Sequence, residues 1–321
     1  MIGQTETSGA GVHHLLIDTD AGIDDAMALF LALRSQELHI VGITSVFGNS
    51  TVEHTTLNAA AVLHCAQRTD IPLAVGASSA MATMLGPRPG IFHGSDGLAN
   101  QGARLRPKSP TLERVPAAWF IHETVRKAPG AVTIAALGPL TNIALAIQMD
   151  RQIATKIGRI VALGGAVRVP GNATPAAEAN FHDDPHAAAI VLASGIDVTL
   201  VGLDCTTDVV MDPGYIEAVF AHDTPESNFM RSIIGWYQDA YATYHGMQQS
   251  VICHDATLIM YLLHPEWFET ELLPVNITTS GRNKGMLLVD HKRVWDDSEQ
   301  VRVCTAVDAP RVLAAILEHF A

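Results

Sequence analysis

The chain has 321 residues, of which 48% are hydrophobic and 17% are charged. This composition is too apolar for a disordered protein, and no uninterrupted apolar run approaches the about 20 residues of a membrane-spanning helix. A formal net charge of −13 argues against a nucleic-acid partner, because phosphate binding needs a basic face. The composition therefore predicts a soluble globular protein, long enough to bury a sizeable core in one large domain or two smaller ones.

The N-terminus and the cysteines indicate the compartment. The opening stretch "MIGQTETSGAGVHH" has no Lys, no Arg and no apolar core, so it is not typical of a secretory signal. The cysteines are scattered without a CxxC pair, which favours reduced, mostly buried thiols over a disulfide framework or a zinc site. They are Cys65, Cys205, Cys253 and Cys304. We therefore expect a cytoplasmic protein in which residues 1–12 form a flexible extension.

Short β-branched runs alternate with helical patterns over the first two thirds of the chain. The predicted strands cover residues 13–18, 38–46, 71–75, 131–137, 158–165 and 197–204. The predicted helices cover residues 24–35, 51–67, 116–128, 139–149, 184–194 and 212–221. This alternation is typical of βαβ units, and strands that are apolar on both faces favour a parallel sheet covered by helices on both sides.

The pattern changes after residue 267. The runs "WFETELLPVNITT", "KGMLLVD" and "EQVRVCTAV" predict extra strands before a closing helix over 308–319. The longest irregular segments are 76–115, 164–183 and 246–254, and no repeat or flexible linker divides the chain. The sequence thus predicts one α/β domain over residues 1–321, with a Rossmann-like, mostly parallel central sheet and extra C-terminal strands.

The stretch "LLIDTDAGIDDAMALFLAL" concentrates four aspartates. Asp18 and Asp20 project to the same side at the end of the first strand, and Asp24 and Asp25 fall in the first turn of the helix that follows. Helix capping explains an isolated Asp pair, but four carboxylates repel one another unless a cation lies among them. Oxygen ligands favour Ca²⁺ or Mg²⁺. An EF-hand is excluded, because the twelfth residue from Asp18 is Leu29 instead of Glu.

Polar or glycine-rich signals follow several of the predicted strands. Beyond the aspartates of the first strand, they are "FGN" with Asn49, "LGPLTN", "LGG" and "GLD" with Asp204. Each of these alone is typical of an ordinary turn. Because ligands bind outside the carboxyl ends of parallel strands, the signals together predict one crevice at that edge of the sheet.

Two further segments offer polar side chains. The loop "GNATPAAEANFHDDP" contains Asn172, Glu178 and Asn180, and the last two point the same way if the loop is extended. Turn chemistry alone also explains these residue types. The segment "VICHDATLIMYLLH" places His254 and Asp255 at the start of a helix. Taken alone, an Asp at this position is typical of a helix cap.

Six motifs carry a family resemblance: "DTDAGIDDAMAL", "FGN", "HGSDGL", "LGPLTNIA", "GNATPAAEAN" and "HDATLI". In order and approximate spacing, the chain from about 14 to 319 resembles the calcium-dependent nucleoside hydrolases of the inosine-uridine-preferring family. Ala21 stands where Pro is commonest, at a place that needs no side chain. Leu137 replaces the Thr of some members, but the family uses the carbonyl oxygen there. Ala179 replaces the Phe of several purine-handling members, so the resemblance leaves the preferred base open.

The resemblance implies hydrolysis of the N-glycosidic bond of nucleosides to ribose and free base, with Ca²⁺ as cofactor. The implied ligands of the metal are Asp20, Asp25, Asp255 and the Leu137 carbonyl oxygen, and Asp18 would support them from behind. One water and the 2′ and 3′ hydroxyls of the ribose would complete the coordination. The carboxylates would also stabilise the oxocarbenium-like charge that develops on the ribose.

The same resemblance implies roles around the substrate. Asp24 would accept hydrogen bonds from the ribose diol. The remaining hydroxyls would contact Asn49, Asn172, Glu178 and Asn180. Asp20 is the implied base for the calcium-bound water, and His254, with a near-neutral intrinsic pKa, is the implied acid for the departing base.

Candidates for contacts with the base lie in two places. His93 would touch the base from a loop. Three tyrosines share one helical face at i, i+4 and i+7 spacing and could wall a base pocket, although their spacing favours a packed aromatic stripe. They are Tyr237, Tyr241 and Tyr244.

Two alternatives come from other protein classes. Asp18-Thr19-Asp20 is similar to the start of haloacid-dehalogenase-like phosphatases, which use Mg²⁺, but Ala21 and Gly22 stand where that family expects Gly-Thr. A non-catalytic nucleoside or sugar binder would have no use for the implied base and acid. The family resemblance further implies a homodimer or homotetramer that acts on a small-molecule nucleoside, without a nucleic-acid or membrane partner.

Overall fold

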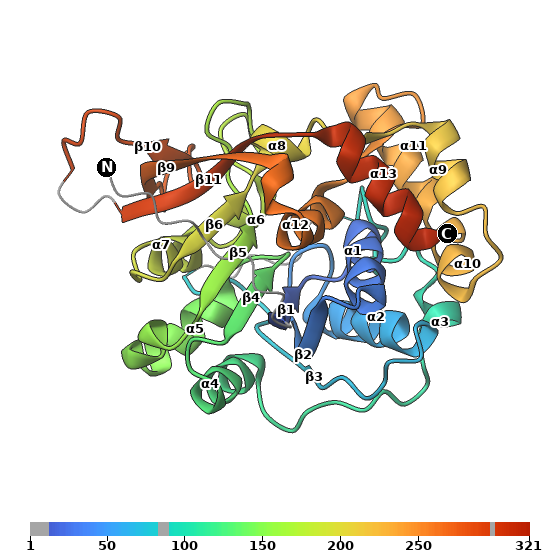
Figure 1. The fold of residues 1–321 in the computed structure, drawn as a ribbon, viewed down its shortest axis with the longest axis horizontal. Helices are drawn as coiled ribbons and strands as arrows, with labels where there is room; N and C mark the ends of the chain where they lie inside the picture. The colour runs from blue at the N-terminus through green and yellow to red at the C-terminus, as the bar shows by residue number, and fades with distance from the viewer. Residues whose placement is uncertain (1–12, 83–89, 296–298) are drawn as a thin grey trace.

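The computed structural model describes residues 13–82, 90–295 and 299–321, so the predicted extension at 1–12 lies outside the described residues. The described chain forms a central sheet with helices on both faces (Figure 1). Six strands run parallel in the order β3-β2-β1-β4-β5-β6. They are β1 (His13–Thr19), β2 (Leu38–Ser45), β3 (Leu73–Ala74), β4 (Val132–Ala136), β5 (Arg159–Leu163) and β6 (Val198–Val201). The predicted Rossmann-like parallel sheet is confirmed.

The C-terminal strands extend the sheet beyond β6. β11 (Glu299–Val307) pairs parallel with β6, and β9 (Phe268–Ile277) lies antiparallel between β11 and the short β10 (Leu287–Val289). The three predicted extra strands are therefore confirmed. A separate antiparallel pair, β7 (Val210–Met211) and β8 (Val251–Ile252), was not predicted, because two residues are too few to show alternation.

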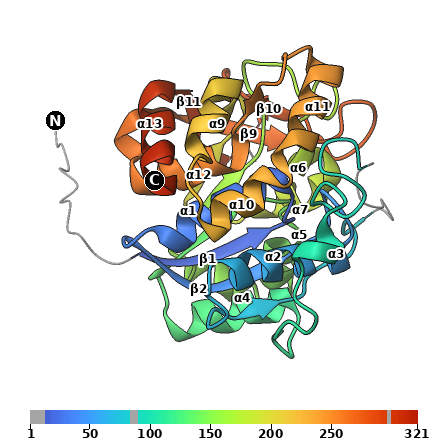
Figure 2. The same cartoon turned by 90° about the vertical axis from the view of Figure 1, so that its right-hand side faces the viewer.

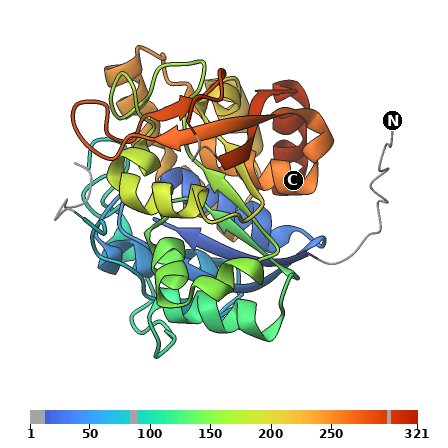
Figure 3. The same cartoon turned by 90° about the vertical axis from the view of Figure 1, so that its left-hand side faces the viewer.

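Helices cover both faces of the sheet because alternate residues of its strands point to opposite sides. Leu16 of β1 faces the helices α4 (Ala117–Lys127), α5 (Thr141–Met149) and α7 (Pro185–Leu192), which Figure 3 shows in front of the sheet. Leu15 and Ile17 face the opposite layer. That layer contains α1 (Ile23–Arg34), α2 (Val52–Cys65), α12 (His254–Leu263) and α13 (Ala309–Phe320).

Three further helices and several single turns complete the fold around the layer that contains α1. Figure 2 shows α9 (Pro213–Val219), α10 (Pro225–Arg231) and α11 (Ile234–His245) gathered on this side. Single turns occur at α3 (Gly102–Leu105), α6 (Ala179–Asp183), α8 (Leu203–Thr206), η1 (Arg151–Thr155) and η2 (Pro265–Trp267). The sequence predicts α9 and the tyrosine face of α11. It gives no signal for the single turns, because one turn is too short to show helical periodicity.

The topology places a ligand crevice between β1 and β4. From β1 the sheet continues through β2 and β3 on one side and through β4, β5 and β6 on the other. Connections leave β1 and β4 in opposite directions at this point, which opens a crevice at their carboxyl ends. All four cysteines are free thiols and three are buried, as predicted. In the described ranges, no helix is both long and apolar enough to cross a membrane.

Candidate active site

A cavity of about 740 Å³ opens at the carboxyl ends of the parallel strands. Its walls include residues that follow five strands, namely Asp20 after β1, Asn49 after β2, Leu137 after β4, Gly164 after β5 and Gly202 after β6. The turns that the sequence places at successive strand ends therefore meet in one space. The predicted crevice is confirmed.

The structure brings most of the predicted site residues to this cavity. Those that line it are Asp20, Asp24, Asn49, His93, Leu137, Asn172, Glu178, Asn180, Tyr237, Tyr241, His254 and Asp255. Asp18 and Asp25 lie directly behind the wall, fully buried. Their positions agree with the predicted strand end and first helical turn.

Of the two interpretations of the three tyrosines, the base-pocket wall does not hold for Tyr244. Its side chain is 59% exposed and packs beside Phe92, with ring centroids 5.8 Å apart, instead of lining the cavity. Tyr237, Tyr241 and His245 follow one another at four-residue spacing along the cavity wall. Tyr244 lies about 60° around the helix axis from Tyr241 and about 100° from His245, so its side chain falls outside the face that lines the cavity.

Asp25 and Asp20 are held in fixed orientations. Asp25 Oδ1 accepts a hydrogen bond from Thr19 Oγ1 (2.6 Å), and its Oδ2 accepts from Gly22 N (2.8 Å) and Asn49 Nδ2 (2.9 Å). Asp20 Oδ2 accepts from Asn49 N (2.8 Å). A Cβ at Gly48 would lie only 2.1 Å from that oxygen, so this approach requires glycine.

Three carboxylates converge at the cavity. Asp24, Asp25 and Asp255 each present one oxygen, and the three oxygens lie within 4.8 Å of one another. Asp255 Oδ1 is buried without a hydrogen-bond partner among the described residues. Burial, together with the charges of Asp24, Asp25 and Asp20, raises the pKa of Asp255 well above its usual range. A hard divalent cation fits this donor set, because it would neutralise the repulsion and occupy the unpartnered oxygen.

This geometry differs in one member from the predicted ligand set. The sequence assigns Asp20 to the metal and Asp24 to the ribose, whereas the close group contains Asp24. The Leu137 carbonyl oxygen accepts a hydrogen bond from Asn180 Nδ2 (2.7 Å). Since a carbonyl oxygen has two lone pairs, this bond leaves one lone pair for a cation.

Asp18 lies near the end of β1, behind the residues that line the cavity. Its Oδ1 accepts hydrogen bonds from Thr44 Oγ1 (2.5 Å) and Asn142 Nδ2 (2.7 Å), while its Oδ2 is buried with no partner in the described chain. Burial raises the pKa of Asp18 to about 6, and the two hydrogen bonds only partly oppose this effect. At neutral pH the ionised Asp18 therefore destabilises the metal-free protein.

The stability of chelator-treated protein is expected to reflect this group. The folded-state pKa lies above the unfolded value of 3.8, so the stabilisation by protonated Asp18 is complete below pH 3.8 and is lost as the pH rises through about 6. Between pH 4.5 and 7.5 this loss is about 2 kcal/mol. Asp18→Asn removes the titration, so urea unfolding should show the variant gaining about that amount relative to wild type over this range. If the free energies of unfolding of the two proteins changed with pH in parallel, the raised pKa would not belong to Asp18.

His254 begins α12, as predicted, and lies nine-tenths buried in the cavity wall. Its Nδ1 is hydrogen-bonded to Thr206 Oγ1 (2.8 Å), so Nε2 is the nitrogen left for a ligand. Burial lowers the pKa of His254 to about 4, although the charge of Asp24 opposes this shift. The imidazole is therefore neutral at pH 7.

Aromatic side chains surround Asp24 on the other side of the cavity. Tyr237 donates its hydroxyl hydrogen to Asp24 Oδ2 (2.8 Å), and burial raises the pKa of Tyr237 well above its usual range. His93 Nδ1 accepts from Ile23 N (3.2 Å), which places the ring hydrogen on Nε2. The rings of His93 and Tyr237 lie 5.3 Å apart, and Tyr241 packs 4.8 Å from Tyr237. These rings form an apolar wall beside a charged carboxylate.

The loop before α6 does not continue as an extended chain through Asn180, because α6 begins at Ala179. Glu178 is the N-cap of α6, and its carboxylate accepts from Asn180 N (2.9 Å), Phe181 N (3.1 Å) and Gly165 N (3.3 Å). The condition of an extended loop is therefore not met, because these helical N–H groups find their acceptor in the Glu178 side chain. Glu178 and Asn180 nevertheless both line the cavity. Asn172 Oδ1 accepts from Ala179 N (2.9 Å), so the loop folds back on the helix start.

Several cavity residues were missed by sequence reasoning. They are Ile91, Phe92, His182, Asp183 and His245, which line the cavity, and Thr206, which contacts His254. His245 could have been found, because it follows Tyr241 by four residues on the same helical face. Nothing in the sequence indicates Thr206, whose contact depends on how α8 and α12 pack.

Comparisons with known proteins agree with this geometry. The family model described as inosine-uridine preferring nucleoside hydrolase matches residues 15–314. A probable uridine nucleosidase 2 of Arabidopsis thaliana is 37% identical over 95% of this chain and 96% of its own length. The pyrimidine-specific ribonucleoside hydrolase RihA of Salmonella gallinarum is 36% identical over 96% of this chain and 99% of its own.

Solved structures show the same fold over nearly the whole chain. A plant nucleoside hydrolase, the PpNRh1 enzyme, superposes with a TM-score of 0.91 at 33% identity, over 97% of this chain and 99% of its own. A purine-preferring ribonucleoside hydrolase from Gardnerella vaginalis gives 0.89 at 29% identity, over 96% and 98%. With a matching family model and relatives above 30% identity, the phosphatase and non-catalytic alternatives are set aside. The chain belongs to the inosine-uridine preferring nucleoside hydrolases and is an enzyme that hydrolyses the N-glycosidic bond of nucleosides.

Proposed function

We propose that this hydrolase requires Ca²⁺ held by Asp20, Asp25, Asp255 and the Leu137 carbonyl oxygen. The observation that carries the metal is the cluster of Asp24, Asp25 and Asp255 oxygens in the cavity wall, with one buried Asp255 oxygen that has no hydrogen-bond partner among the described residues. The family resemblance supports Asp20 and the Leu137 carbonyl oxygen as ligands in place of Asp24. When bound, the cation would supply an acidified water and a charged anchor for the ribose diol. Four oxygen donors match the preference of a hard cation.

The chain's own residues perform the remaining steps. Asp20, fixed by Asn49 N and by the close approach of Gly48, accepts the proton of the attacking water. Asp24 accepts hydrogen bonds from the ribose diol, and the Tyr237 hydroxyl holds its second oxygen in place. As the C1′–N bond breaks, positive charge develops on the ribose. The surrounding carboxylates stabilise that charge.

His254 delivers the proton to the departing base from Nε2. A pKa of about 4 keeps the imidazole neutral before reaction. Nε2 therefore takes a proton from solvent as negative charge builds on the base and passes it to the base nitrogen as the C1′–N bond breaks, which returns the imidazole to its neutral form. Such charge next to an imidazole favours its protonated form. Thr206 supports this role by fixing the orientation of the ring through Nδ1.

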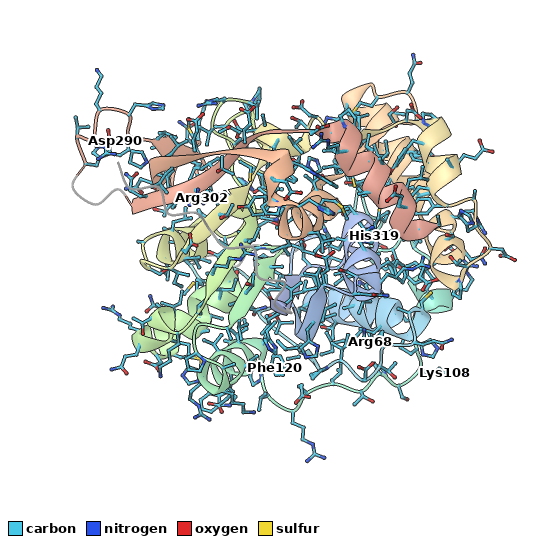
Figure 4. All side chains as sticks on the ribbon, viewed as in Figure 1. Arg68, Lys108, Phe120, Asp290, Arg302 and His319 are labelled. Carbon is cyan, nitrogen blue, oxygen red and sulfur yellow. The ribbon has the colours of Figure 1, made fainter. Side chains whose placement is uncertain are left out.

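The charge of the cavity selects uncharged nucleosides over nucleotides. Its described walls contain five carboxylates and neither Lys nor Arg, whereas Arg68, Lys108 and Arg302 lie on other parts of the molecule (Figure 4). A phosphate group would therefore meet repulsion without a basic partner. The relatives named for uridine or for pyrimidines support uridine as the preferred nucleoside.

Ribose release measures this function directly. Uridine, cytidine, inosine and uridine monophosphate are incubated with the enzyme, with and without a calcium chelator. We expect release from uridine above all, little from the nucleotide, loss with the chelator and recovery on adding Ca²⁺. Full activity in the chelator would overturn the metal assignment, and a preference for inosine would overturn the base assignment.

Asn180→Ala is expected to lower kcat and not merely to raise KM. The proposed contacts of Asn172, Glu178 and Asn180 with ribose hydroxyls tighten as charge develops on the ring, so their loss weakens the transition state more than the substrate complex. Steady-state kinetics with uridine separates the two constants. A variant with wild-type kcat and a higher KM would make Asn180 a residue of uniform binding.

The family resemblance also supports a cytoplasmic homodimer or homotetramer. Sedimentation of the purified protein measures its assembly, and fractionation of cells measures its location.

A further inference from the structure

We propose that Asp204 is a positioning residue that fixes the segment bearing Asn172 and Glu178 against the cavity. The inference rests on the proposed function, which assigns those two side chains to ribose hydroxyls. Asp204 lies on the single turn α8 and is 8% exposed. Its neighbours Leu203 and Gly202 line the cavity, whereas Asp204 is not among the lining residues.

The carboxylate of Asp204 binds the main chain where the segment leaves β5. Its Oδ2 accepts from Val167 N (2.7 Å), and its Oδ1 accepts from Arg168 N (2.6 Å). Both bonds are charge-assisted, so they are stronger than bonds between neutral groups. Each carboxylate oxygen accepts from one N–H group. An Asn side chain has a single acceptor oxygen, so it could keep only one of these two hydrogen bonds.

A second contact joins α8 to the same segment. Leu203 N donates to Gly165 O (2.9 Å), and a Cβ at Gly202 would lie 2.5 Å from that oxygen. Gly165 N in turn donates to Glu178 (3.3 Å). The segment from Gly165 to Glu178 is therefore attached to α8 at its first residue, and its last residue returns to contact that same Gly165.

The turn that holds the ribose segment also holds His254. Thr206 lies two residues after Asp204 on α8, and its Oγ1 is hydrogen-bonded to His254 Nδ1 (2.8 Å). The segment with the ribose contacts and the proposed acid His254 are thus both hydrogen-bonded to α8. A shift of α8 would misalign both, and a displacement of about 1 Å in a catalytic arrangement can cost about 10²-fold in rate.

A matched control lies on the same segment. Arg168 forms an exposed ion pair with Glu271 (2.7 Å). Arg168→Ala removes this side-chain contact but keeps both main-chain bonds to Asp204. Exposed pairs contribute little, so kcat/KM for uridine should stay within about threefold of wild type.

The experiment compares Asp204→Asn, Asp204→Ala and Arg168→Ala by steady-state kinetics, calcium titration and amide hydrogen exchange. For Asp204→Ala we expect kcat/KM for uridine to fall by about 10- to 100-fold, with calcium affinity unchanged and faster exchange at Val167 and Arg168. Asp204→Asn retains one acceptor and should lose less. If Asp204→Ala does not fold, Asp204→Asn still tests the proposal through its kinetics and exchange.

A double-mutant cycle separates positioning from a general loss of stability. If Asp204 acts through the ribose segment, adding Asn172→Ala to Asp204→Ala should cost far less than the product of the two single losses. Multiplicative losses, or wild-type kinetics in both Asp204 variants, would overturn the proposal. Failure of the proposed function would appear differently, as absence of ribose release by the wild-type enzyme.

Discussion

Asp25→Ala and Asp20→Ala are expected to lose calcium binding and ribose release together. Removing a group that merely supports a metal ligand costs about 10- to 100-fold in affinity, so losing a ligand should cost more than about 100-fold. Asp25 is fully buried and accepts three hydrogen bonds, so the Ala variant leaves several donors unpaired. Asp25→Asn avoids this problem. The –NH₂ group of the Asn side chain can take the place of Asp25 Oδ1 and donate to Thr19 Oγ1, because a hydroxyl group can accept as well as donate a hydrogen bond.

Calorimetric titration with Ca²⁺ measures this prediction, and the far-ultraviolet circular dichroism of each variant establishes that it folds. Asp223→Asn is the matched control, because it removes a carboxylate whose side chain is 92% exposed and lies outside the cavity. It should bind Ca²⁺ as wild type does. Unchanged calcium affinity in both the Asp20 and the Asp25 variants would refute the metal site, even if their activity fell.

Asp24 lies close to Asp25 and Asp255, so the same calcium titration can also decide whether Asp24 binds the metal or the ribose. If Asp24 is a metal ligand instead of a partner of the ribose diol, Asp24→Asn will lose calcium affinity as strongly as Asp25→Asn. If it binds ribose, Asp24→Asn will keep calcium affinity and lose kcat/KM. The Tyr237 hydroxyl bonds to Asp24 Oδ2. Asp24 Oδ1 accepts from Asp25 N (3.2 Å), and its second lone pair can serve either role.

The parallel part of the sheet and its helices can be predicted because the sequence patterns that indicate them are local and repeat along the chain. Strands such as β4 and β6 are buried on both faces and appear in the sequence as short apolar runs, and the covering helices have an apolar face. Asp24 and Asp25 follow from the helix start, and His254 from the start of α12. The meeting of distant strand ends at one cavity follows from topology alone, since carboxyl ends of parallel strands share an edge.

The single turns could not be predicted, because tertiary contacts determine them. The predicted strand 197–204 is too long, since β6 ends at Val201 and α8 begins at Leu203. The chain turns there because Gly202 fits against Gly165 O, with no room for a Cβ. The capping of α6 by Glu178 depends likewise on the approach of Gly165 N. Thr206 reaches His254 only because of this turn.

His254→Ala should impair the enzyme according to the leaving group of the substrate. General acid catalysis contributes about 10²–10⁴-fold, and that is the expected loss of kcat/KM with inosine or uridine. With p-nitrophenyl riboside, whose phenolate leaves without a proton, the loss should be small. Calcium affinity should stay nearly unchanged, because imidazole is a poor ligand for this hard cation.

Thr206→Val gives a graded comparison, because it keeps the shape of the side chain and removes the hydrogen bond to His254 Nδ1. It should reproduce part of the His254→Ala loss with inosine and uridine and almost none with p-nitrophenyl riboside. An equal loss of His254→Ala on both substrate types would mean that His254 shapes the cavity without protonating the base. The acid would then lie in the opposite wall. There His93, with its hydrogen on Nε2, is favoured over Tyr237, whose raised pKa and bond to Asp24 make it a poor proton donor.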